Sequence, residues 1–134
     1  MLKQLSIYAE NKKGALQAMT NALYEAGINI WGSVTNDGAE YGINRMVVSD
    51  PDKAKEVLTE SGYLCRFVDV LAVEIEDKPG ALNTLLTALL DSNVNVDYTY
   101  LSFNRDSSTP VMILHTADPE EVEICLKAKG FKMV

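Results

Sequence analysis

The residues best suited to chemistry lie in a short stretch that the sequence contains twice, 66 residues apart. The first copy reads Glu-Asn-Lys-Lys-Gly-Ala-Leu over residues 10–16, and the second reads Glu-Asp-Lys-Pro-Gly-Ala-Leu over residues 76–82. Each copy places a glycine where a helix is expected to begin, and the unpaired N–H groups there attract a carboxylate or a phosphate. Gly14 and Gly80 also leave the backbone open to a ligand, because they have no Cβ atom.

Polar side chains around each turn could complete such a site. Asn11 and Asp77 occupy the same place in the two copies. Asn29 and Asn95 stand at the start of the next expected strand, where their amides could reach the same turn. A small zwitterion would suit this group, with its carboxylate on backbone N–H groups and its ammonium on Asp77 or an amide oxygen. Such residues also occur in turns that bind nothing, so the pattern allows a binding site and a plain turn alike.

The remaining reactive side chains favour structural roles. His115 is the only histidine, and it lies on an alternating apolar strand without a second ligand at metal spacing. Cys65 and Cys125 lack C-x-x-C spacing, so we expect buried, reduced thiols. Trp31, the only tryptophan, could pack in a core or line the site. The sequence shows no Ser/His/Asp arrangement for nucleophilic catalysis, so we expect that the protein is not an enzyme. We also expect it to bind no cofactor and no metal ion.

The charge balance excludes several classes of partner. The chain of 134 residues carries 12 Lys and Arg against 19 Asp and Glu, a net charge of −7. Nucleic acid and anionic membrane surfaces both need a basic protein surface. No run approaches the roughly 18 apolar residues of a membrane span, and the first residues do not read as a signal peptide. These features predict a cytoplasmic protein without a membrane or nucleic-acid partner.

Hydrophobic periodicity predicts the elements that position the two turns. Strands alternate apolar and polar residues, whereas helices repeat them at spacings of three and four. In the first half we expect strand 5–10, helix 16–26, strands 28–35 and 41–49 around an Asn36-Asp37-Gly38 turn, a helix from Asp50-Pro51 to Gly62, and strand 64–68. In the second half we expect strand 71–75, helix 82–89, strands 94–103 and 111–116, a helix from Asp118-Pro119 with Glu121 as capping-box partner, and a short strand 131–134.

This order predicts an α+β fold of two ferredoxin-like βαββαβ units, residues 1–68 and 69–134. Each unit should have an antiparallel sheet with both helices on one face. Units of about 65 residues are small for independent folding, so we expect them to pack against each other. Apolar strand residues suggest that the face opposite the helices is partly covered; they are Val34, Met46, Val48, Tyr98 and Tyr100.

The repeated motif resembles that of ACT domains, which are small βαββαβ regulatory modules that bind amino acids. The resemblance rests on the two turn motifs and on the Gly-Ile-Asn-Ile and Asn-Val-Asn-Val sequences that follow at residues 27–30 and 93–96. It covers nearly the whole chain as two tandem copies and leaves no catalytic domain. It implies that two domains pack side by side and bind amino acids where the turn of one faces the second strand of the other.

The resemblance implies two ligand sites and names their residues. One site would use Asn11, Lys12, Lys13, Gly14, Ala15 and Leu16 with Val96, Asp97 and Tyr98 of the other half. Its mate would use Asp77, Lys78, Pro79, Gly80, Ala81 and Leu82 with Ile30, Trp31 and Gly32. Asn29 matches Asn95, and each belongs to the motif of its own copy.

Three functions are compatible with the sequence. The first is a regulatory protein that binds an amino acid, and the family implies a homodimer. The second is a regulatory subunit of a metabolic enzyme that lacks a ligand of its own. The third is a small enzyme on a ferredoxin-like frame. Relatives of that third kind would need a basic anion loop, a basic sheet with aromatics or a Cys pair in the first loop, and the sequence has none of these.

Overall fold

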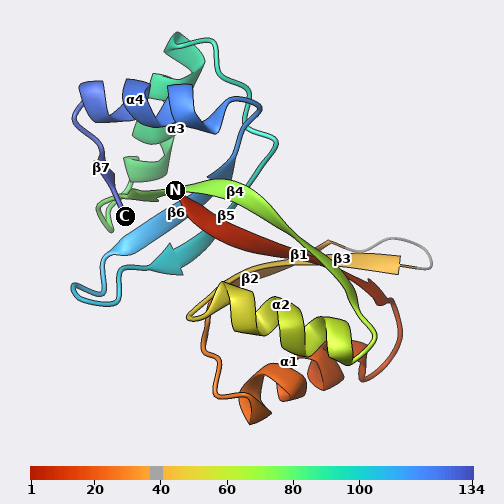
Figure 1. The fold of residues 1–134 in the computed structure, drawn as a ribbon. Helices are drawn as coiled ribbons and strands as arrows, with labels where there is room; N and C mark the ends of the chain where they lie inside the picture. Colours follow the sequence, from red (N-terminus) through yellow and green to blue (C-terminus); the bar gives the residue numbers. More distant parts are fainter. Residues whose placement is uncertain (37–40) are drawn as a thin grey trace. The chain divides into compact units, whose positions relative to one another are not determined.

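The computed structural model describes residues 1–36 and 41–134, which form four helices and seven strands (Figure 1). In chain order they are β1 (Leu2–Glu10), α1 (Ala15–Glu25), β2 (Ile30–Asn36), β3 (Tyr41–Val48), α2 (Pro51–Glu60), β4 (Leu64–Glu74), α3 (Ala81–Asp91), β5 (Tyr98–Phe103), β6 (Pro110–His115), α4 (Pro119–Ala128) and β7 (Lys132–Met133). The α+β fold with two βαββαβ repeats is confirmed. The expected turn at Asn36-Asp37-Gly38 falls largely on residues 37–40, outside the described residues.

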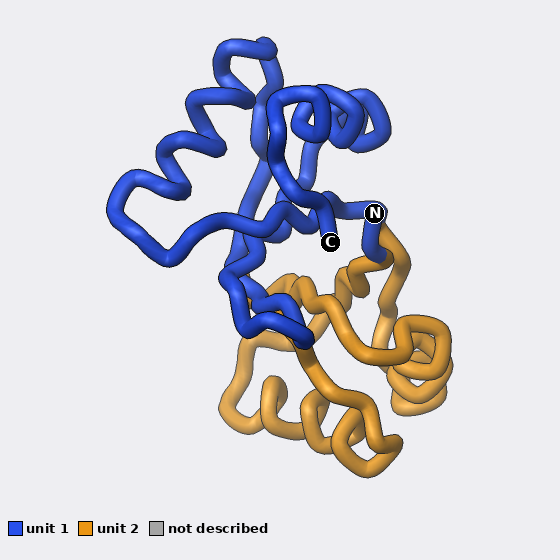
Figure 2. The backbone as a smooth tube through the Cα atoms, turned by 90° about the vertical axis from the view of Figure 1, so that its left-hand side faces the viewer, with its two compact units in different colours: residues 1–2, 69–134 blue, residues 3–68 orange. Residues whose placement is uncertain are grey.

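The chain forms two compact units (Figure 2). One consists of residues 3–68, called the first half below, and the other of residues 69–134 with residues 1–2, called the second half. Strand β4 begins in the first half and ends in the second. The expectation of separate strands at residues 64–68 and 71–75 is therefore wrong, because one uninterrupted strand covers both.

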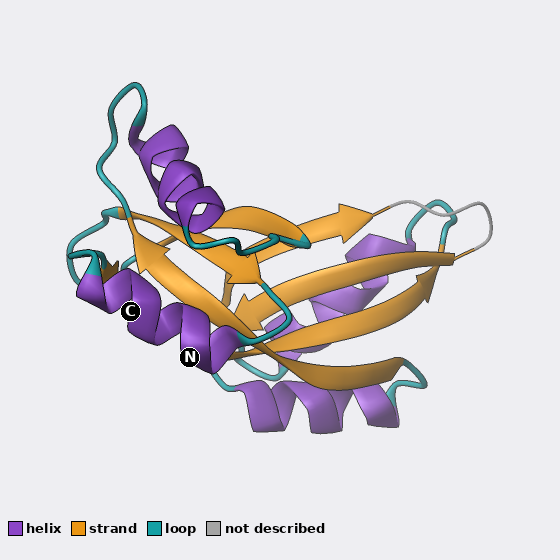
Figure 3. Cartoon of the chain, turned by 90° about the horizontal axis from the view of Figure 1, so that it is seen from above, coloured by secondary structure: helices purple, strands orange, loops and turns teal. Residues whose placement is uncertain are grey.

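The first half has the strand order β2-β3-β1-β4, and its two helices pack on one face of the sheet (Figure 3). Leu5 pairs with Met46 across β1 and β3, so both side chains point to the same face. That face forms the core, whose buried residues are Leu5, Ile7, Met19, Leu23, Ile28, Met46, Val48, Ala54, Leu58 and Cys65. The expectation that Met46 and Val48 lie on the face opposite the helices is wrong, because this register turns them toward α1 and α2.

The second half has the order β4-β6-β5, with β7 pairing with β4. Leu71 pairs with Leu114 and Val73 with Met112, and these four side chains lie under the helices. Their core also contains Leu85, Leu89, Val122 and Leu126. On the opposite face Tyr100 pairs with Ile113, and both are buried. Tyr100 was expected on the face opposite the helices, and the structure places it there as a buried residue.

The four helices begin in two different ways. Helices α1 and α3 follow Gly14 and Gly80, which have φ values of +83° and +87° and provide no side-chain cap. Only glycine adopts this left-handed conformation at little cost. Helix α2 follows Asp50, whose Oδ1 accepts the Lys53 N–H at 3.1 Å, as expected. Asp118 makes no side-chain capping bond at α4, so the expected capping box is absent there.

Strand β5 begins at Tyr98, four residues later than expected. Asn93 adopts a left-handed φ of +58°, and the Val94 N–H still donates to the carbonyl of Leu89 in α3. Residues 93 and 94 therefore belong to the C-terminal cap of α3, where the apolar pattern predicted the start of a strand. The Asp97 N–H then donates to the carbonyl of His115 at 2.9 Å, and regular pairing follows.

Candidate functional site

A pocket of about 600 Å³ opens at the repeated turn of the first half. It lies between the end of β1, the start of α1 and the start of β4. Its lining residues are Tyr8, Ala9, Glu10, Lys12, Lys13, Gly14, Ala15, Ala18, Gly62, Tyr63 and Leu64. This volume falls within the range of about 300–1,000 Å³ that small-molecule sites occupy.

The second half has a pocket of about 360 Å³ at the matching place. It is lined by Glu74, Ile75, Glu76, Lys78, Ala81, Thr84, Gly130, Phe131 and Lys132. Each of these residues is the counterpart of one that lines the first pocket, at an offset of 66 before the β5–β6 loop and 68 after it. The pocket therefore occurs in both copies of the repeat, although many of its lining side chains differ between the two halves.

Each helix that borders a pocket offers free N–H groups. The first helical bond of α1 is donated by Ala18, so the N–H groups of Leu16 and Gln17 have no protein acceptor among the residues described. Leu82 and Asn83 repeat this arrangement in α3. Neither helix has an acidic residue in its first turn. The positive end of each helix dipole is thus not offset by a side chain, which favours an external anion.

An ion pair recurs at the rim of both pockets. Lys12 Nζ lies 3.0 Å from Glu10 Oε2, and Lys78 Nζ lies 2.8 Å from Glu76 Oε2. All four side chains are exposed, so the pairs contribute little to stability. They do place one ammonium and one carboxylate beside the free N–H groups in each half.

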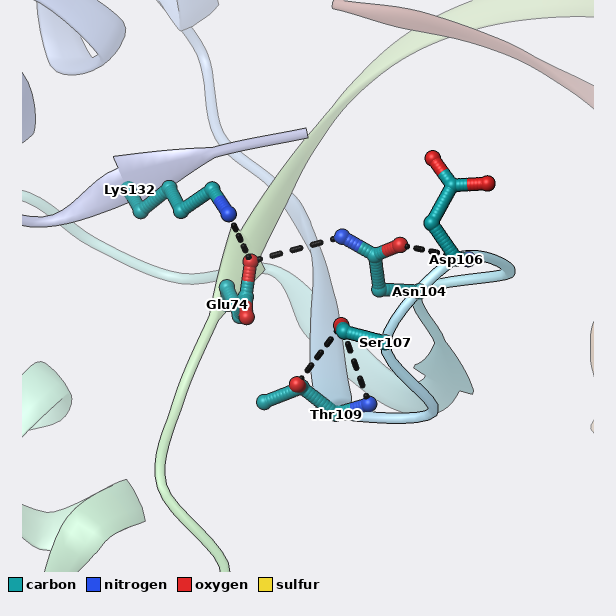
Figure 4. Close-up of polar contacts among 6 residues, drawn as sticks. All are labelled: Glu74, Asn104, Asp106, Ser107, Thr109 and Lys132. Atoms are coloured by element: carbon teal, nitrogen blue, oxygen red, sulfur yellow. Dashed lines mark hydrogen bonds and ion pairs between the residues drawn. The ribbon is translucent and has the colours of Figure 1, made fainter.

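The two pockets differ most at the end of the first strand. In the second half Glu74 Oε2 accepts from Lys132 Nζ at 3.2 Å and from Asn104 Nδ2 at 3.4 Å, and the two donors approach it from opposite sides (Figure 4). The hydrogen bond from Lys132 lowers the pKa of Glu74, against the opposing effect of desolvation. In the first half Tyr8 takes this place, and its hydroxyl accepts from Arg66 at 3.1 Å.

The β5–β6 loop is fixed beside Glu74 by its own polar contacts (Figure 4). Asn104 Oδ1 accepts the Asp106 N–H at 2.9 Å while its Nδ2 reaches Glu74. The Ser107 hydroxyl lies 2.7 Å from Thr109 Oγ1 and accepts the Thr109 N–H at 3.4 Å. The loop thus positions an amide donor at the second pocket.

Half of the site residues expected from the two turns line the pockets. Lys12, Lys13, Gly14 and Ala15 line the first pocket, and Lys78 and Ala81 line the second. The others in the two turns are exposed next to them; they are Asn11, Leu16, Asp77, Pro79, Gly80 and Leu82.

The second-strand residues lie elsewhere in their own half. Asn29 and Ile30 line a separate groove, and the Asn29 N–H donates to Ser49 Oγ at 2.9 Å. The 11 residues of α1 separate them from the turn by about 16 Å along the helix. Asn95 and Asp97 line a groove at the far end of α3. The structure therefore does not bring the asparagine amides to the turn of their own half.

The other second-strand residues have local packing partners. Trp31 is half-buried in β2, where the pairing register shifts between Ile30 and Gly32. Val96 packs against the second core. Tyr98 stacks on His115 with ring centroids 5.0 Å apart, and His115 Nδ1 lies 2.8 Å from Asp97 Oδ2. His115 thus has a carboxylate and a ring as partners, which sequence reasoning did not identify.

Sequence reasoning missed the third wall of each pocket. Gly62 to Leu64 close the first pocket, and Gly130 to Lys132 close the second. The signal was present as the matching Gly-Tyr and Gly-Phe pairs before the last strand of each half. Within the described ranges, no group of His, Cys, Asp or Glu could hold a metal ion. No helix there is long and apolar enough to cross a membrane.

Comparison with known proteins places the chain in a family. A family model described as an ACT domain pair matches residues 1–133. Protein BT0572 from Bacteroides thetaiotaomicron is 31% identical with a TM-score of 0.91, over 99% of this chain and 91% of that one. Among curated proteins none matches this chain.

More distant structures share the fold. The regulatory subunit of aspartate kinase from Thermus thermophilus is 17% identical with a TM-score of 0.68, over 94% of this chain and 88% of its own. That from Thermus flavus is 19% identical with a TM-score of 0.61, over 96% and 91%. The chain, with its turn, pocket and helix start repeated in both halves, belongs to the family of ACT domain pairs.

Proposed function

We propose that this ACT domain pair is a non-catalytic regulatory protein that binds an amino acid at its repeated turns. The observation that carries the proposal is the pocket that recurs in both halves beside a helix start with free N–H groups and no acidic residue in the first turn. A helix N-terminus of this kind binds a carboxylate through hydrogen bonds and through the helix dipole together. An amino acid supplies that carboxylate together with an ammonium.

The remaining groups suit the rest of an amino acid. In the second half, Glu76 and Asp77 offer carboxylates for the ammonium at the rim of the pocket. The ligand's side chain would extend toward the wall formed by the last strand. That wall carries Tyr63 and Leu64 in the first half, but Phe131 and Lys132 in the second. We therefore propose that the two halves differ in ligand preference, with the first pocket taking the larger or less polar side chain.

A second ACT domain would complete each site. Because Asn29 and Asn95 lie away from the turn of their own half, they can contribute only to a site whose turn belongs to another domain. We propose that the second-strand residues play this role; they are Asn29, Ile30, Trp31 and Gly32, and Asn95, Val96, Asp97 and Tyr98. A ligand held by two domains favours one arrangement of them, which is how binding would be coupled to regulation.

The regulated partner would be a metabolic enzyme. Regulatory subunits of aspartate kinase share the fold, which supports a regulatory role without identifying the enzyme. We propose that the protein works in the cytoplasm as a homodimer, and gel filtration of the full chain tests the dimer. The alternative is a regulatory subunit that binds its enzyme without an amino acid.

Thermal unfolding in the presence of each of the twenty amino acids tests the proposal. A ligand that binds only the native state stabilises it, by about 2.7 kcal/mol at a concentration one hundred times its Kd. We expect one amino acid, or a few related ones, to raise the melting temperature. If none does so at millimolar concentration, the alternative of a subunit without a ligand is favoured.

Gln17→Glu and Asn83→Glu locate the ligand carboxylate. Each change places a carboxylate in the first turn of the helix beside the free N–H groups, where it competes with the ligand while stabilising the helix by about 0.5 kcal/mol. We expect a higher melting temperature without ligand and a smaller rise with it. Gln17→Ala and Asn83→Ala are the uncharged controls and should retain the ligand response.

Asn29→Ala and Asn95→Ala test the contribution of the second strands. We expect each to weaken the response to the amino acid while leaving the free protein folded. An unchanged response in both variants, together with a reduced one in Gln17→Glu, would retain the turn as the site and remove the second strand from it.

A further inference from the structure

The two halves differ sharply where the first helix of each half ends beside the start of the second. In the first half a lysine fills this place, because Lys53 Nζ donates to the carbonyl oxygen of Ala26 at 2.8 Å. Ala26 is the C-cap residue of α1. The C-terminus of a helix carries a partial negative charge, so an ammonium is stabilised there by the dipole and by the hydrogen bond.

The second half retains this frame but has no lysine in it. Glu121 stands at the position of Lys53, and Ser92 stands at the position of Ala26. A groove of about 410 Å³ is open at this place. Its lining residues are Ser92, Asn93, Val94, Asn95, Asp97, Thr116, Ala117, Asp118, Glu121, Val122 and Cys125.

The lining of this groove is acidic. It contains the carboxylates of Asp97, Asp118 and Glu121 and neither lysine nor arginine. Asp118 makes no capping bond, and within the described part of the chain neither Asp118 nor Glu121 forms an ion pair. The C-terminus of α3, whose C-cap residue is Ser92, adds its partial negative charge. The groove is therefore suited to a cation.

A buried hydroxyl points to a ligand independently of the charges. Thr116 lines the groove, is 2% exposed, and its Oγ1 has no hydrogen-bond partner among the residues described. Its counterpart in the first half is Val48, which has no group to satisfy. An unpaired buried hydroxyl is unfavourable, and its occurrence beside an open groove is explained when a ligand donates a hydrogen bond to it.

We propose that this groove binds a primary alkylammonium group in the position that Lys53 occupies in the first half. An ammonium has three N–H donors, which can serve separate acceptors without the close ligand cluster that a metal requires. In agreement with this, the described side chains contain no group that could hold a metal ion. The 11 residues of α3 separate the groove from the turn at Gly80, so an amine bound here would not contact that turn. The groove does share Asn95 and Asp97 with the second-strand residues proposed above for the amino-acid site.

The ammonium could belong to a free amine or to a lysine side chain of another protein. n-Butylammonium, which reproduces the side chain of Lys53 from Cβ to Nζ, serves as the probe of the shared chemistry. N-acetyl-lysine methylamide reproduces a lysine residue within a protein. Stronger binding of n-butylammonium favours a free amine, and stronger binding of the lysine amide favours a protein partner.

Amide NMR spectra of the full chain, titrated at constant ionic strength, test the proposal. We expect saturable shifts at Ser92, Asn93, Ala117, Asp118 and residues 120–122, with little change at Gly14 and Gly80. Neutral n-butanol should leave these signals unchanged. Equal shifts with n-butanol, or no saturable shift at the groove with either amine, would overturn the proposal.

Substitutions at the start of α4 identify the acceptor. We expect Glu121→Gln to weaken binding about tenfold, because it removes a charge-assisted hydrogen bond. Glu120→Gln is the matched control, since it removes the same charge from the same helical turn at an exposed residue outside the groove. Equal weakening by the two variants would mean that only the overall charge matters, and would contradict a defined site.

Glu121→Lys provides a second and independent variant. It places an ammonium in the groove as Lys53 does in the first half, so we expect a higher melting temperature and the loss of the n-butylammonium response. Retention of that response would overturn the proposal. Gln17→Glu should reduce the response to the amino acid and leave binding of n-butylammonium unchanged. The two proposed sites can therefore fail separately: one failure appears in the amino-acid response and the other in the amine response.

Discussion

At the scale of single residues, the tandem repeat allows a residue in one half to be compared with its counterpart in the other half. Thr116 and Val48 occupy matching places in the two cores, and both are buried. They have nearly the same shape, so exchanging them isolates the effect of the hydroxyl group. Glu74 and Tyr8 form a second such pair at the pockets, where a carboxylate replaces a phenol.

Thr116→Val should stabilise the protein. The substitution removes a buried hydroxyl without a partner and leaves the volume almost unchanged, so we expect a gain of about 1–2 kcal/mol in the free energy of unfolding. Urea unfolding of both proteins at neutral pH measures this difference. Val48→Thr is the reciprocal control and should destabilise by a similar amount. A destabilised Thr116→Val protein would show that the hydroxyl is satisfied without an added amine.

Glu74→Gln should weaken the dependence of stability on acid pH. The Lys132 hydrogen bond lowers the pKa of Glu74 below its ordinary value of 4.5 in the folded protein. Its contribution to stability is therefore complete above pH 4.5 and is lost as the pH falls below that value through the folded-state pKa. We expect the variant to melt below the parent protein at pH 7 and to approach it at pH 3.

Glu123 provides the comparison for that experiment. Its pKa is also lowered, chiefly by the hydrogen bond from Lys127. The Glu74→Gln protein should therefore retain part of the acid dependence, and the double variant Glu74→Gln, Glu123→Gln should retain less. If the single variant and the parent differ by the same amount at pH 3 and pH 7, ionisation of Glu74 does not account for its effect.

At the scale of elements, local sequence determined most of the fold correctly. The offset between copies of the Gly-Ala-Leu turn identified the repeat, and Asp50-Pro51 correctly marked the start of α2. The length of β4 could not be read, because residues 64–68 and 71–75 each satisfy the pattern of a strand alone. Pairing with different strands along its length determines that β4 is continuous. The start of β5 was misread because a left-handed Asn93 extends the helix closure into an apolar segment.

The same distinction applies to the candidate site. The turn residues were predictable because glycine, amide and charged side chains cluster in sequence. The wall formed by residues 62–64 was not, because the chain passes through two helices and two strands after the turn before it returns to it. The positions of Asn29 and Asn95 were likewise decided by the direction of α1 and α3, which carry the chain away from the turn.

Asp50→Ala and Asp118→Ala should differ in their effects on the two second helices. Asp50 accepts the Lys53 N–H at 3.1 Å, and the loss of such a cap costs about 1 kcal/mol. Asp118 makes no capping bond, so its loss should cost about 0.3 kcal/mol through the helix dipole alone. Chemical denaturation of the two variants measures the difference. Equal costs would show that Asp118 caps α4 in solution.

At the scale of the whole molecule, one strand contributes to both cores. Cys65 of β4 belongs to the core of the first half, whereas Leu71 and Val73 of the same strand belong to that of the second. Strand β4 has β1 as its neighbour in the first half and β6 in the second. If one half unfolds, its part of β4 loses its pairing and its core contacts, and the other half depends on the same strand. A repeat joined by a flexible linker would have no such coupling.

Leu58→Ala and Leu126→Ala test whether the two halves unfold together. The two leucines are counterparts, both fully buried, and each substitution should cost about 2–5 kcal/mol. Trp31 lies in the first half, so its fluorescence reports that half, whereas far-UV circular dichroism reports both. Because β4 is continuous, we expect the two signals to change in a single transition, and we expect Leu126→Ala to shift the Trp31 transition although it lies in the other core. An unshifted Trp31 transition, with a second step in circular dichroism, would show that each half unfolds independently.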